Sequence, residues 1–416
     1  MFASRTNWSL EPNRLTQALE ERRRRGLPVF DLTESNPTRC GFTYDTEQIL
    51  GALRDPRALK YEPDARGLLS ARQAVVHYYA LRGVEVRPEQ IFLTTSTSEA
   101  YTFVFRLLAN PGDQLLAPQP SYPLFDFLVG LSDVEIVPYP LSYDQHWQID
   151  LSALEAAVGP RARAILAVHP NNPTGSFVTT TELDFLKHCW QKGRLAIVAD
   201  EVFADYPLLP PGMERVTSFA SAAGALTFTL SGLSKISALP QMKVAWVVVN
   251  GPVQDLEQAL WRLEVIADTY LSLSAPAALA LPAWLESRQG IQMQIRKLLR
   301  SNLNWLDSQL GPGAPVCRLK VEGGWYVILK ILSEGADTGE TAVLQTEDRR
   351  ATGGAPVVRT DEDWVVEWVE KEGVLVHPGH FYDFPEDGFF VASLLTPPEV
   401  FKPSLEKILR HLANVR

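Results

Sequence analysis

The sequence predicts an α/β fold with a mostly parallel sheet, because short apolar runs alternate with longer helical patterns along most of its 416 residues. The seven runs that have the length of strands are Gln90–Thr94, Gln114–Ala117, Val134–Val137, Ala162–Val168, Leu195–Ala199, Leu226–Leu230 and Val244–Val249. Asn172, Asp200 and Lys235 each follow the end of one such run. Because parallel sheets bind ligands at the carboxyl ends of their strands, we expect these three side chains to share one site.

The length of the chain and its 46% hydrophobic content allow a large core and more than one domain. We expect a large domain at residues 46–290, which contains the seven-stranded sheet, and a smaller α/β domain at residues 291–416. The N-terminal segment, residues 1–45, is expected to join the smaller domain. A helical pattern from about Gly251 to Gly290 predicts a long helix that leads out of the large domain.

Three patterns in the smaller domain and one near the N-terminus predict local structure. Trp325–Leu329 predicts a strand, Asp363–Lys371 predicts a helix, and Asp348–Thr360 predicts a surface loop. The basic run Arg22–Arg25 precedes Gly26, and positive charge in the last turn of a helix complements the helix dipole. The run therefore predicts the end of a helix rather than a binding patch.

Charge and cysteine content argue against several classes of partner. The formal net charge of -10 and the isoelectric point near 5.3 argue against a nucleic-acid-binding surface. No apolar run reaches the roughly 18 residues that a membrane helix requires, and the first residues lack the apolar core of a signal peptide. The cysteines, Cys40, Cys189 and Cys317, lack metal-ligand spacing, so we expect no metal and reduced thiols in the cytoplasm.

An amine, a carboxylate and an amide at strand ends suit one cofactor particularly well, pyridoxal 5′-phosphate (PLP). Lys235 would hold the aldehyde of the cofactor covalently and act as general base and acid, and Asp200 would keep the pyridine nitrogen protonated. Asn172 would donate a hydrogen bond to the phenolic oxygen. Each residue alone also fits an ordinary role, as a solvated lysine, a helix cap or a turn residue.

Three motifs carry a resemblance to a known family. They are His-Pro-Asn-Asn-Pro-Thr-Gly at 169–175, Ala-Asp-Glu-Val at 199–202 and Ser-Gly-Leu-Ser-Lys at 231–235. In this order they resemble the class I and II aminotransferases, the aspartate aminotransferase family of fold-type I PLP enzymes, and the resemblance runs from about Asp31 to nearly the C-terminus. It implies a homodimer that moves an amino group between an amino acid or amine and a 2-oxo acid.

The resemblance also implies the contacts of the phosphate and the ring. Thr95, Ser96 and Thr97 match the phosphate loop of the family, in which amide groups at a helix start bind the anion. Ser234 matches a phosphate-binding hydroxyl, and Lys243 stands where the family usually has an arginine that binds the phosphate.

Two tyrosines complete the implied cofactor site. Tyr122 matches the aromatic residue that stacks on the pyridine ring, and Tyr61 matches the tyrosine that crosses a dimer interface to the neighbour's phosphate. Two other positions depart from the family. Gly232 stands where a second phosphate-binding hydroxyl is common, and Phe203 replaces a tyrosine that contacts the phenolic oxygen.

The largest departure concerns the substrate. Val391 stands where the family usually has the arginine that binds the α-carboxylate of the amino acid. Arg39 and His380 are the candidate replacements, and Asn36 and Tyr270 are further candidates for substrate contacts. Without the arginine we expect poor turnover of aspartate and glutamate and better turnover of a donor with large apolar contacts. Trp325, the Phe389–Phe390 pair and Tyr270 could supply such contacts, although each also fits an ordinary core role.

Two alternatives remain open at the level of sequence. One is another PLP reaction on the same scaffold, such as a carbon–sulfur lyase that works by β-elimination. The other is a non-catalytic binding module that keeps the fold. The residues do not name the amino donor or the oxo-acid acceptor.

Overall fold

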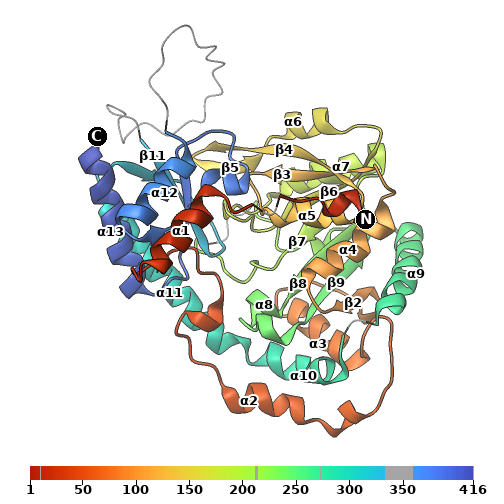
Figure 1. Cartoon of the computed structure of the whole chain (residues 1–416). Coiled ribbons are helices and arrows are strands. Elements are labelled where there is room, and N and C mark those ends of the chain that lie inside the picture. The colour runs from red at the N-terminus through yellow and green to blue at the C-terminus, as the bar shows by residue number, and fades with distance from the viewer. Residues whose placement is uncertain (10, 211–213, 272, 333–358, 416) are drawn as a thin grey trace.

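The computed structural model describes residues 1–9, 11–210, 214–271, 273–332 and 359–415. Figure 1 shows a larger part, built around one long sheet, and a smaller part that contains the C-terminus. The N-terminal segment runs from α1 in the smaller part across to α5 in the larger part. Among the described residues, no helix is both long enough and apolar enough to cross a membrane.

An eight-stranded sheet, counted over the described residues, forms the centre of the larger part. Its strands are β2 (Ile91–Thr94), β3 (Gln114–Gln119), β4 (Glu135–Asp144), β5 (His146–Ile149), β6 (Ala162–Val168), β7 (Ala196–Asp200), β8 (Thr227–Gly232) and β9 (Ala245–Asn250). The spatial order is β2-β9-β8-β7-β6-β3-β4-β5, and the five strands from β8 to β4 pair in parallel. The predicted mostly parallel sheet is confirmed, and β5 adds an antiparallel edge strand.

Helices cover this sheet, which explains why its central strands have apolar side chains in both directions. The helices of the larger part are α2 (Thr46–Gly51), α3 (Leu69–Ala80), α4 (Thr97–Leu108), α5 (Leu124–Leu131), α6 (Leu151–Ala157), α7 (Thr180–Gly193), α8 (Leu233–Ile236), α9 (Val253–Tyr270) and α10 (Ala275–Glu286). Local sequence sets their ends. The capping box of Thr179 and Glu182 starts α7, and Arg194 ends it in the left-handed conformation.

The smaller part has a four-stranded antiparallel sheet in the order β10-β11-β14-β13. Its strands are β10 (Val316–Arg318), β11 (Tyr326–Ile331), β13 (His377–Pro378) and β14 (Phe389–Ser393), and its helices are α11 (Arg288–Gln309), α12 (Asp361–Lys371) and α13 (Pro398–Val415). The short 3-10 helices of the chain are η1 (Ser4–Thr6), η2 (Pro37–Arg39), η3 (Ala52–Arg54), η4 (Pro56–Leu59), η5 (Pro88–Gln90), η6 (Phe219–Ser221), η7 (Pro240–Met242) and η8 (Gly379–Tyr382).

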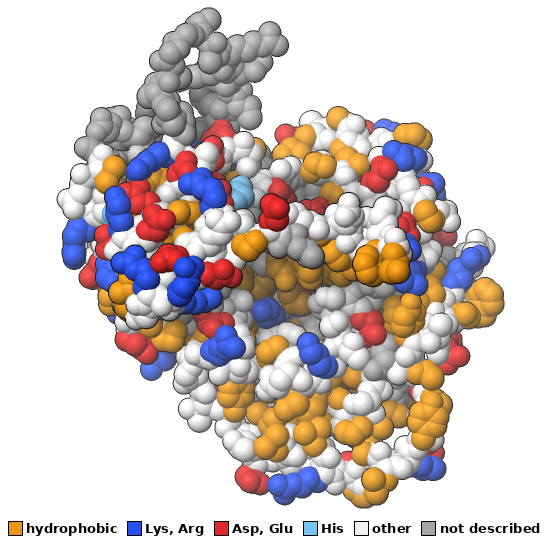
Figure 2. Space-filling model, viewed as in Figure 1, with side chains coloured by type: hydrophobic (Ala, Val, Ile, Leu, Met, Phe, Trp, Pro, Cys, Tyr) orange, Lys and Arg blue, Asp and Glu red, His pale blue; other side chains and the backbone are white. Residues whose placement is uncertain are grey.

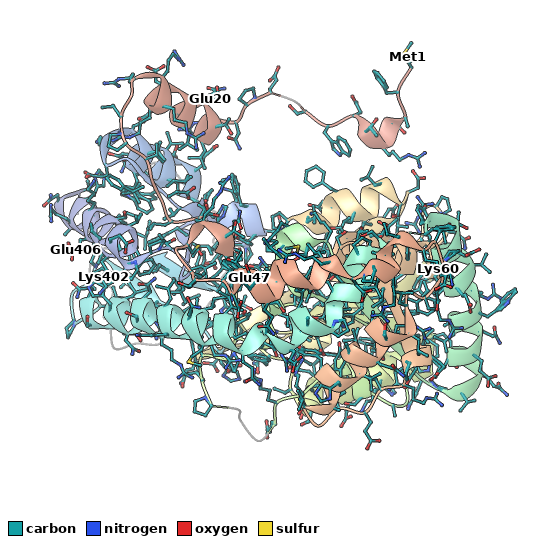
Figure 3. The ribbon with its side chains drawn as sticks, turned by 90° about the horizontal axis from the view of Figure 1, so that it is seen from below. Met1, Glu20, Glu47, Lys60, Lys402 and Glu406 are labelled. Atoms are coloured by element: carbon teal, nitrogen blue, oxygen red, sulfur yellow. The ribbon has the colours of Figure 1, made fainter. Side chains whose placement is uncertain are left out.

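The N-terminal segment contacts the smaller part. Strand β1 (Phe30–Asp31) pairs in parallel with β12 (Val374–Leu375), and α1 (Arg14–Arg24) packs against α12. The guanidinium group of Arg22 donates to the carbonyl of Glu370 at 2.9 Å. Figure 3 shows Glu20 on α1, well apart from Lys60 in the larger part. The division of the chain at residues 45 and 290 stays a prediction.

Some local predictions are confirmed and one is wrong. Helix α1 ends just before Gly26, which has a φ of 69°, and α12 covers the helix expected at Asp363–Lys371. The single long helix from Gly251 to Gly290 is instead divided, because Leu271 ends α9 in the left-handed conformation and α10 and α11 follow. Most of the loop expected at Asp348–Thr360 lies outside the described residues.

Candidate active site

Lys235 lies in α8, the single helical turn that follows β8. Its Nζ lies 4.6 Å from the centre of the Trp325 ring and 5.3 Å from the centre of the Phe203 ring. Burial lowers the pKa of the Lys235 ammonium to about 8, and the nearby Asp200 carboxylate partly opposes that shift. A substantial fraction of the amine is therefore neutral, and thus nucleophilic, slightly above neutral pH.

The backbone around Lys235 is fixed by side chains from other elements. The hydroxyl of Tyr206 donates to the carbonyl oxygen of Lys235 at 2.6 Å, and Nε2 of Gln292 donates to the carbonyl oxygen of Ile236 at 2.8 Å. These bonds satisfy carbonyl groups that a short helix leaves without intrahelical partners. The amine is consequently presented from a rigid turn.

Asp200 is the last residue of β7 and is partly buried. Its Oδ2 accepts a hydrogen bond from the Tyr101 hydroxyl, and its Oδ1 accepts one from the Val202 amide, both at 3.0 Å. Burial raises the pKa of Asp200 to about 6, whereas these two bonds and Lys235 act to lower it. The carboxylate is therefore mostly ionised at neutral pH.

Asn172 lies beyond the end of β6, on the same sheet edge as Asp200, because Val168 at the end of β6 pairs with Asp200. The Asn172 side chain is buried, and its Oδ1 has no hydrogen-bond partner among the described residues. A buried polar atom without a partner is costly unless a ligand satisfies it. Oδ1 is an acceptor, so it cannot itself donate to the phenolic oxygen. The Nδ2 group is the donor, and it also has no hydrogen-bond partner among the described residues, so it is free to make that contact.

The phosphate loop begins after β2, and Ser96 caps α4 by accepting a bond from the Glu99 amide at 3.2 Å. The amide and hydroxyl of Thr95 both donate to the Glu99 carboxylate, at 2.8 and 3.0 Å. The amides of Thr97 and Ser98 come next in α4, and among the described contacts neither has a partner. Free amides at a helix start bind anions, so Ser98, which the sequence analysis missed, joins Thr97 as a phosphate candidate.

The other two phosphate candidates differ in their surroundings. Ser234 is partly buried in α8 beside Lys235, whereas Lys243 is exposed just before β9 and adopts a φ of 52°. Gly232 pairs with Ala245 in the sheet, and a Cβ at position 232 would lie 2.9 Å from the Ala245 Cβ and 3.0 Å from the carbonyl oxygen of Val244. The close approach of β9 leaves no room for the hydroxyl that the family often has there.

Replacing Gly232 with alanine is expected to lower the free energy of unfolding by about 1–3 kcal/mol, because the added methyl group forces β8 and β9 apart. Thermal or urea unfolding measures the change. Gly130→Ala in α5 is the control, since nothing lies within 4 Å of the added Cβ, and it should be neutral or slightly stabilising. Equal stability of both variants would contradict the close packing at Gly232.

Tyr122 precedes α5 and borders an open groove. Its ring packs edge to face with Phe125, with the ring centres 6.5 Å apart. The ring of Phe125 also packs on that of Tyr101, whose hydroxyl binds Asp200, and burial together with the Asp200 charge raises the pKa of the Tyr122 hydroxyl. Tyr122 therefore lies where it can contact a ring held at Asp200.

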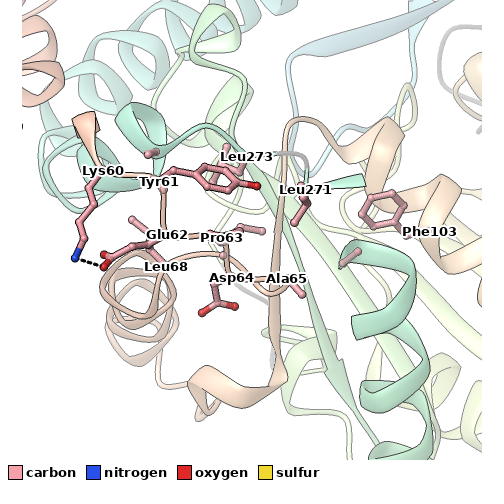
Figure 4. A pocket seen from close by; sticks show the side chains of 15 residues that line it. Lys60, Tyr61, Glu62, Pro63, Asp64, Ala65, Leu68, Phe103, Leu271 and Leu273 are labelled. Carbon is pink, nitrogen blue, oxygen red and sulfur yellow. Dashed lines mark ion pairs between the residues drawn. The ribbon is translucent and has the colours of Figure 1, made fainter. Parts of the chain in front are cut away.

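Tyr61 and Tyr270 lie elsewhere, and among the described contacts neither touches Lys235. Tyr61 is 79% exposed and borders a separate pocket with Leu271 and Phe103 (Figure 4). The ring of Tyr270 packs on that of Phe103 at 5.0 Å, and the guanidinium group of Arg106 lies 5.7 Å from it. A single chain therefore does not bring these tyrosines to the amine.

The remaining substrate candidates lie in or beside two 3-10 helices, η2 and η8. Asn36 caps η2, where its Oδ1 accepts a bond from the Thr38 amide at 3.1 Å. Arg39 at the end of η2 has a side chain that is 73% exposed and lies 3.8 Å from the Glu34 carboxylate. The ring of His380 is exposed and packs against Phe381.

Val391 is fully buried in β14, where it pairs with Ile328 and His377. This position therefore presents no cation. Trp325, one of the apolar contacts expected from sequence, lies beside Lys235 and packs edge to face on Phe203 at 5.3 Å and on Tyr206 at 5.1 Å. Such walls favour apolar groups beside the amine.

Comparisons with known proteins agree with this geometry. Residues 29–386 match the family model described as aminotransferase class I and II. The glutamate-pyruvate aminotransferase AlaA of Escherichia coli (strain K12) is 28% identical over 394 residues, which cover 94% of this chain and 91% of that protein. The S-alkyl-thiohydroximate lyase of Arabidopsis thaliana is 29% identical over 348 residues, which cover 80% of this chain and 68% of that protein. The solved structure of the alanine aminotransferase from Pyrococcus furiosus aligns with this one at a TM-score of 0.83 and 21% sequence identity. The alignment covers 100% of both chains.

The parallel sheet with its smaller α/β part defines the fold-type I architecture, in agreement with the prediction. The match to the family model extends over most of the sequence, so the chain belongs to the class I and II aminotransferases. The predicted aminotransferase is thereby confirmed, and the carbon–sulfur lyase is not favoured.

Proposed function

We propose that the protein binds PLP at Lys235 and transfers an amino group between an amino acid or amine and a 2-oxo acid. The observation that carries this proposal is the partly buried amine of lowered pKa at the sheet edge that also presents Asp200 and Asn172. PLP, when bound, supplies an aldehyde that takes up amino groups and a ring that accepts electrons from the donor.

The side chains of this site have distinct roles in the proposal. The neutral Nζ of Lys235 holds the cofactor and, once an incoming amine has released it, takes the proton from Cα of the donor. The Asp200 carboxylate keeps a positive charge on the ring nitrogen, and the Asn172 amide binds the phenolic oxygen. Ser96, Thr97, Ser98, Ser234 and Lys243 would hold the phosphate. Thr95, the other candidate, already donates its amide and its hydroxyl to the Glu99 carboxylate.

Product analysis tests the reaction directly. The protein should produce one equivalent of a second amino acid for each donor consumed when a 2-oxo acid is present. A panel of donor amines and 2-oxo acids identifies the substrates. Release of ammonia and a 2-oxo acid without an acceptor would instead indicate β-elimination, the reaction class of a lyase.

We propose that Arg39 supplies the positive charge for the substrate carboxylate that Val391 cannot supply. Replacing Arg39 with alanine should raise KM for the 2-oxo acid roughly tenfold with little change in kcat or PLP affinity, because a charge-assisted bond is lost. Arg57→Ala is a matched control, since Arg57 is also in a 3-10 helix, 71% exposed and paired with a carboxylate. Equal KM values for the two variants would contradict this assignment, and the same measurement on His380→Ala tests the other candidate.

A homodimer with composite sites is part of the proposal. Several large apolar side chains near Tyr61 are exposed in one chain, and they include Leu50, Leu59 and Leu69. Figure 2 shows hydrophobic side chains gathered over the lower part of the molecule, where Figure 1 shows α2 and α10. Exposed apolar patches of this kind support association with a second copy of the chain.

Mixed dimers test whether Tyr61 acts on the neighbouring site. Tyr61→Phe alone should weaken PLP binding roughly tenfold without dissociating the dimer, because one hydrogen bond to a charged group is lost. Dimers that combine a Tyr61→Phe subunit with a Lys235→Ala subunit should regain one site of wild-type PLP affinity, since that site has its own lysine and the partner's tyrosine. Only weak sites in the mixed dimers, or a fully active monomer, would contradict composite sites.

Two further expectations accompany this proposal. A cytoplasmic location is supported by the free cysteines Cys40, Cys189 and Cys317.

The division into a large domain at 46–290 and a small domain at 291–416, joined by residues 1–45, is supported by the pairing of β1 with β12.

A further inference from the structure

Tyr101 contacts the site but has no role in the mechanism described above. It lies in the second turn of α4 and is 3% exposed. Its hydroxyl donates to Oδ2 of Asp200 at 3.0 Å. This is a side-chain hydrogen bond from the phosphate-loop helix to the carboxylate proposed to face the ring nitrogen.

The two hydrogen bonds to Asp200 restrict the orientation of its carboxylate. Oδ2 is bound by Tyr101 from α4, and Oδ1 is bound by the Val202 amide from the loop after β7. Since donors on different elements hold the two oxygens, the group cannot rotate about its bond to Cβ without losing one of them. Each oxygen keeps a second lone pair for a ligand.

The Tyr101 ring is itself held by aromatic neighbours. It lies 5.5 Å from the Phe105 ring and 5.4 Å from the Phe125 ring, the latter edge to face. Burial raises the pKa of the Tyr101 hydroxyl well above its ordinary value, and the Asp200 charge adds to that rise. Tyr101 therefore remains a neutral donor, and the carboxylate remains its acceptor.

Other titratable groups face Asp200 from the elements around it. Lys235 approaches from α8, and Tyr122 approaches from the segment before α5. Glu201 follows Asp200 in the chain but binds away from it, with its carboxylate accepting from the Ser218 hydroxyl and the Phe219 amide. Among these, Tyr101 is the side chain that donates a hydrogen bond directly to Asp200.

We propose that Tyr101 is a positioning residue that orients the Asp200 carboxylate and keeps it anionic for the ring nitrogen of PLP. This inference rests on the proposed function. It predicts that removing the hydroxyl weakens the interaction at the ring nitrogen specifically, while contacts to the phosphate and the phenolic oxygen are retained.

The test compares the binding of PLP with that of 1-deaza-pyridoxal 5′-phosphate, in which carbon replaces the ring nitrogen. Tyr101→Phe should weaken PLP binding roughly tenfold and leave binding of the analogue unchanged, because the Asp200 interaction is absent with the analogue. The ratio of the two affinities is also measured as a function of pH. In wild type, the preference for PLP should appear at the pH at which Asp200 becomes ionised, because the carboxylate then interacts with the ring nitrogen. In Tyr101→Phe this pH should be higher, since a hydrogen bond that favours the anion is gone.

Tyr139→Phe is the matched control. Tyr139 is also buried, and its hydroxyl donates to a backbone carbonyl, that of Leu166, at 2.7 Å. This variant should keep the wild-type preference for PLP, and thermal unfolding of both variants checks that they are folded. An equal loss of PLP and analogue affinity in Tyr101→Phe, or no loss of either, would overturn the inference. Failure of the proposed function would look different, because wild type itself would then show no preference for PLP.

Discussion

Replacing Lys235 with arginine is expected to lower the rate of amino transfer by roughly 10⁴-fold or more, because both covalent attachment and proton transfer at Nζ are lost. Arginine keeps a positive charge and a long stem, so the change tests the neutral amine rather than the charge. The rate is measured with saturating donor, acceptor and PLP. The variant should also no longer be modified covalently at position 235.

Lys330→Arg is the control for this substitution. Lys330 is likewise a partly buried lysine near an aromatic ring, with its Nζ 4.9 Å from the centre of the Phe389 ring and 3.3 Å from the Glu386 carboxylate. Its replacement should leave the rate near that of wild type. A Lys235→Arg variant that keeps most of the wild-type rate would contradict the role of Lys235.

Replacing Asp200 with asparagine should have opposite effects on activity and on stability. Activity should fall by roughly 10²–10³-fold, because the carboxylate that stabilises positive charge on the ring nitrogen is gone. The cofactor-free protein should become more stable at pH 7, because the substitution removes a partly buried charge whose pKa is raised by desolvation. Enzyme assays and thermal unfolding of the cofactor-free protein measure the two effects.

The sign of the stability change follows from the raised pKa of Asp200. Its pKa rises from 3.8 to about 6 on folding, so the folded state binds the proton more tightly than the unfolded state. As pH rises from about 4 to about 6, the ionisation of Asp200 therefore lowers the free energy of unfolding of the cofactor-free protein. The decrease is at most about 3 kcal/mol. The gain from Asp200→Asn should consequently be present at pH 7 and absent near pH 4.

Asp113→Asn provides the contrasting control. The Arg163 guanidinium group holds the pKa of Asp113 below its ordinary value, so this carboxylate stabilises the folded state at neutral pH. Its replacement should lower the melting temperature at pH 7. A loss of stability in Asp200→Asn as well would show that the Asp200 charge is compensated in the cofactor-free protein.

The central part of the sheet could be predicted from sequence because its strands are buried on both faces and therefore form continuous apolar runs. Strand β5 could not be recognised in this way. Its residues, His146–Ile149, alternate between exposed and buried positions, and it forms an edge hairpin with β4. The end of α9 at Leu271 was missed because its left-handed conformation is not indicated by the residue type. The start of α10 could have been found, because Ser274 followed by Pro276 is a helix-start signal.

The candidate site shows a similar limit. Lys235, Asp200 and Asn172 could be proposed from sequence, because each follows a strand end within a distinctive motif. Tyr101 approaches them only through the packing of α4, which no local pattern reveals. Trp325 was expected among the apolar contacts of the donor, and the structure places its ring 4.6 Å from Nζ of Lys235. The Ser98 amide could have been found by counting from the Ser96 cap, because the second residue of a helix has a free amide.

The most direct measurement of the central claim is borohydride reduction of the protein with PLP, followed by peptide mapping. Lys235 is a lysine of lowered pKa at the edge of the sheet that presents Asp200 and Asn172, so the reduced cofactor should be found on Lys235 in nearly every labelled chain. The label should be absent in Lys235→Arg. Stoichiometric labelling of a different lysine, or no labelling of the wild-type protein, would contradict the assignment of this site.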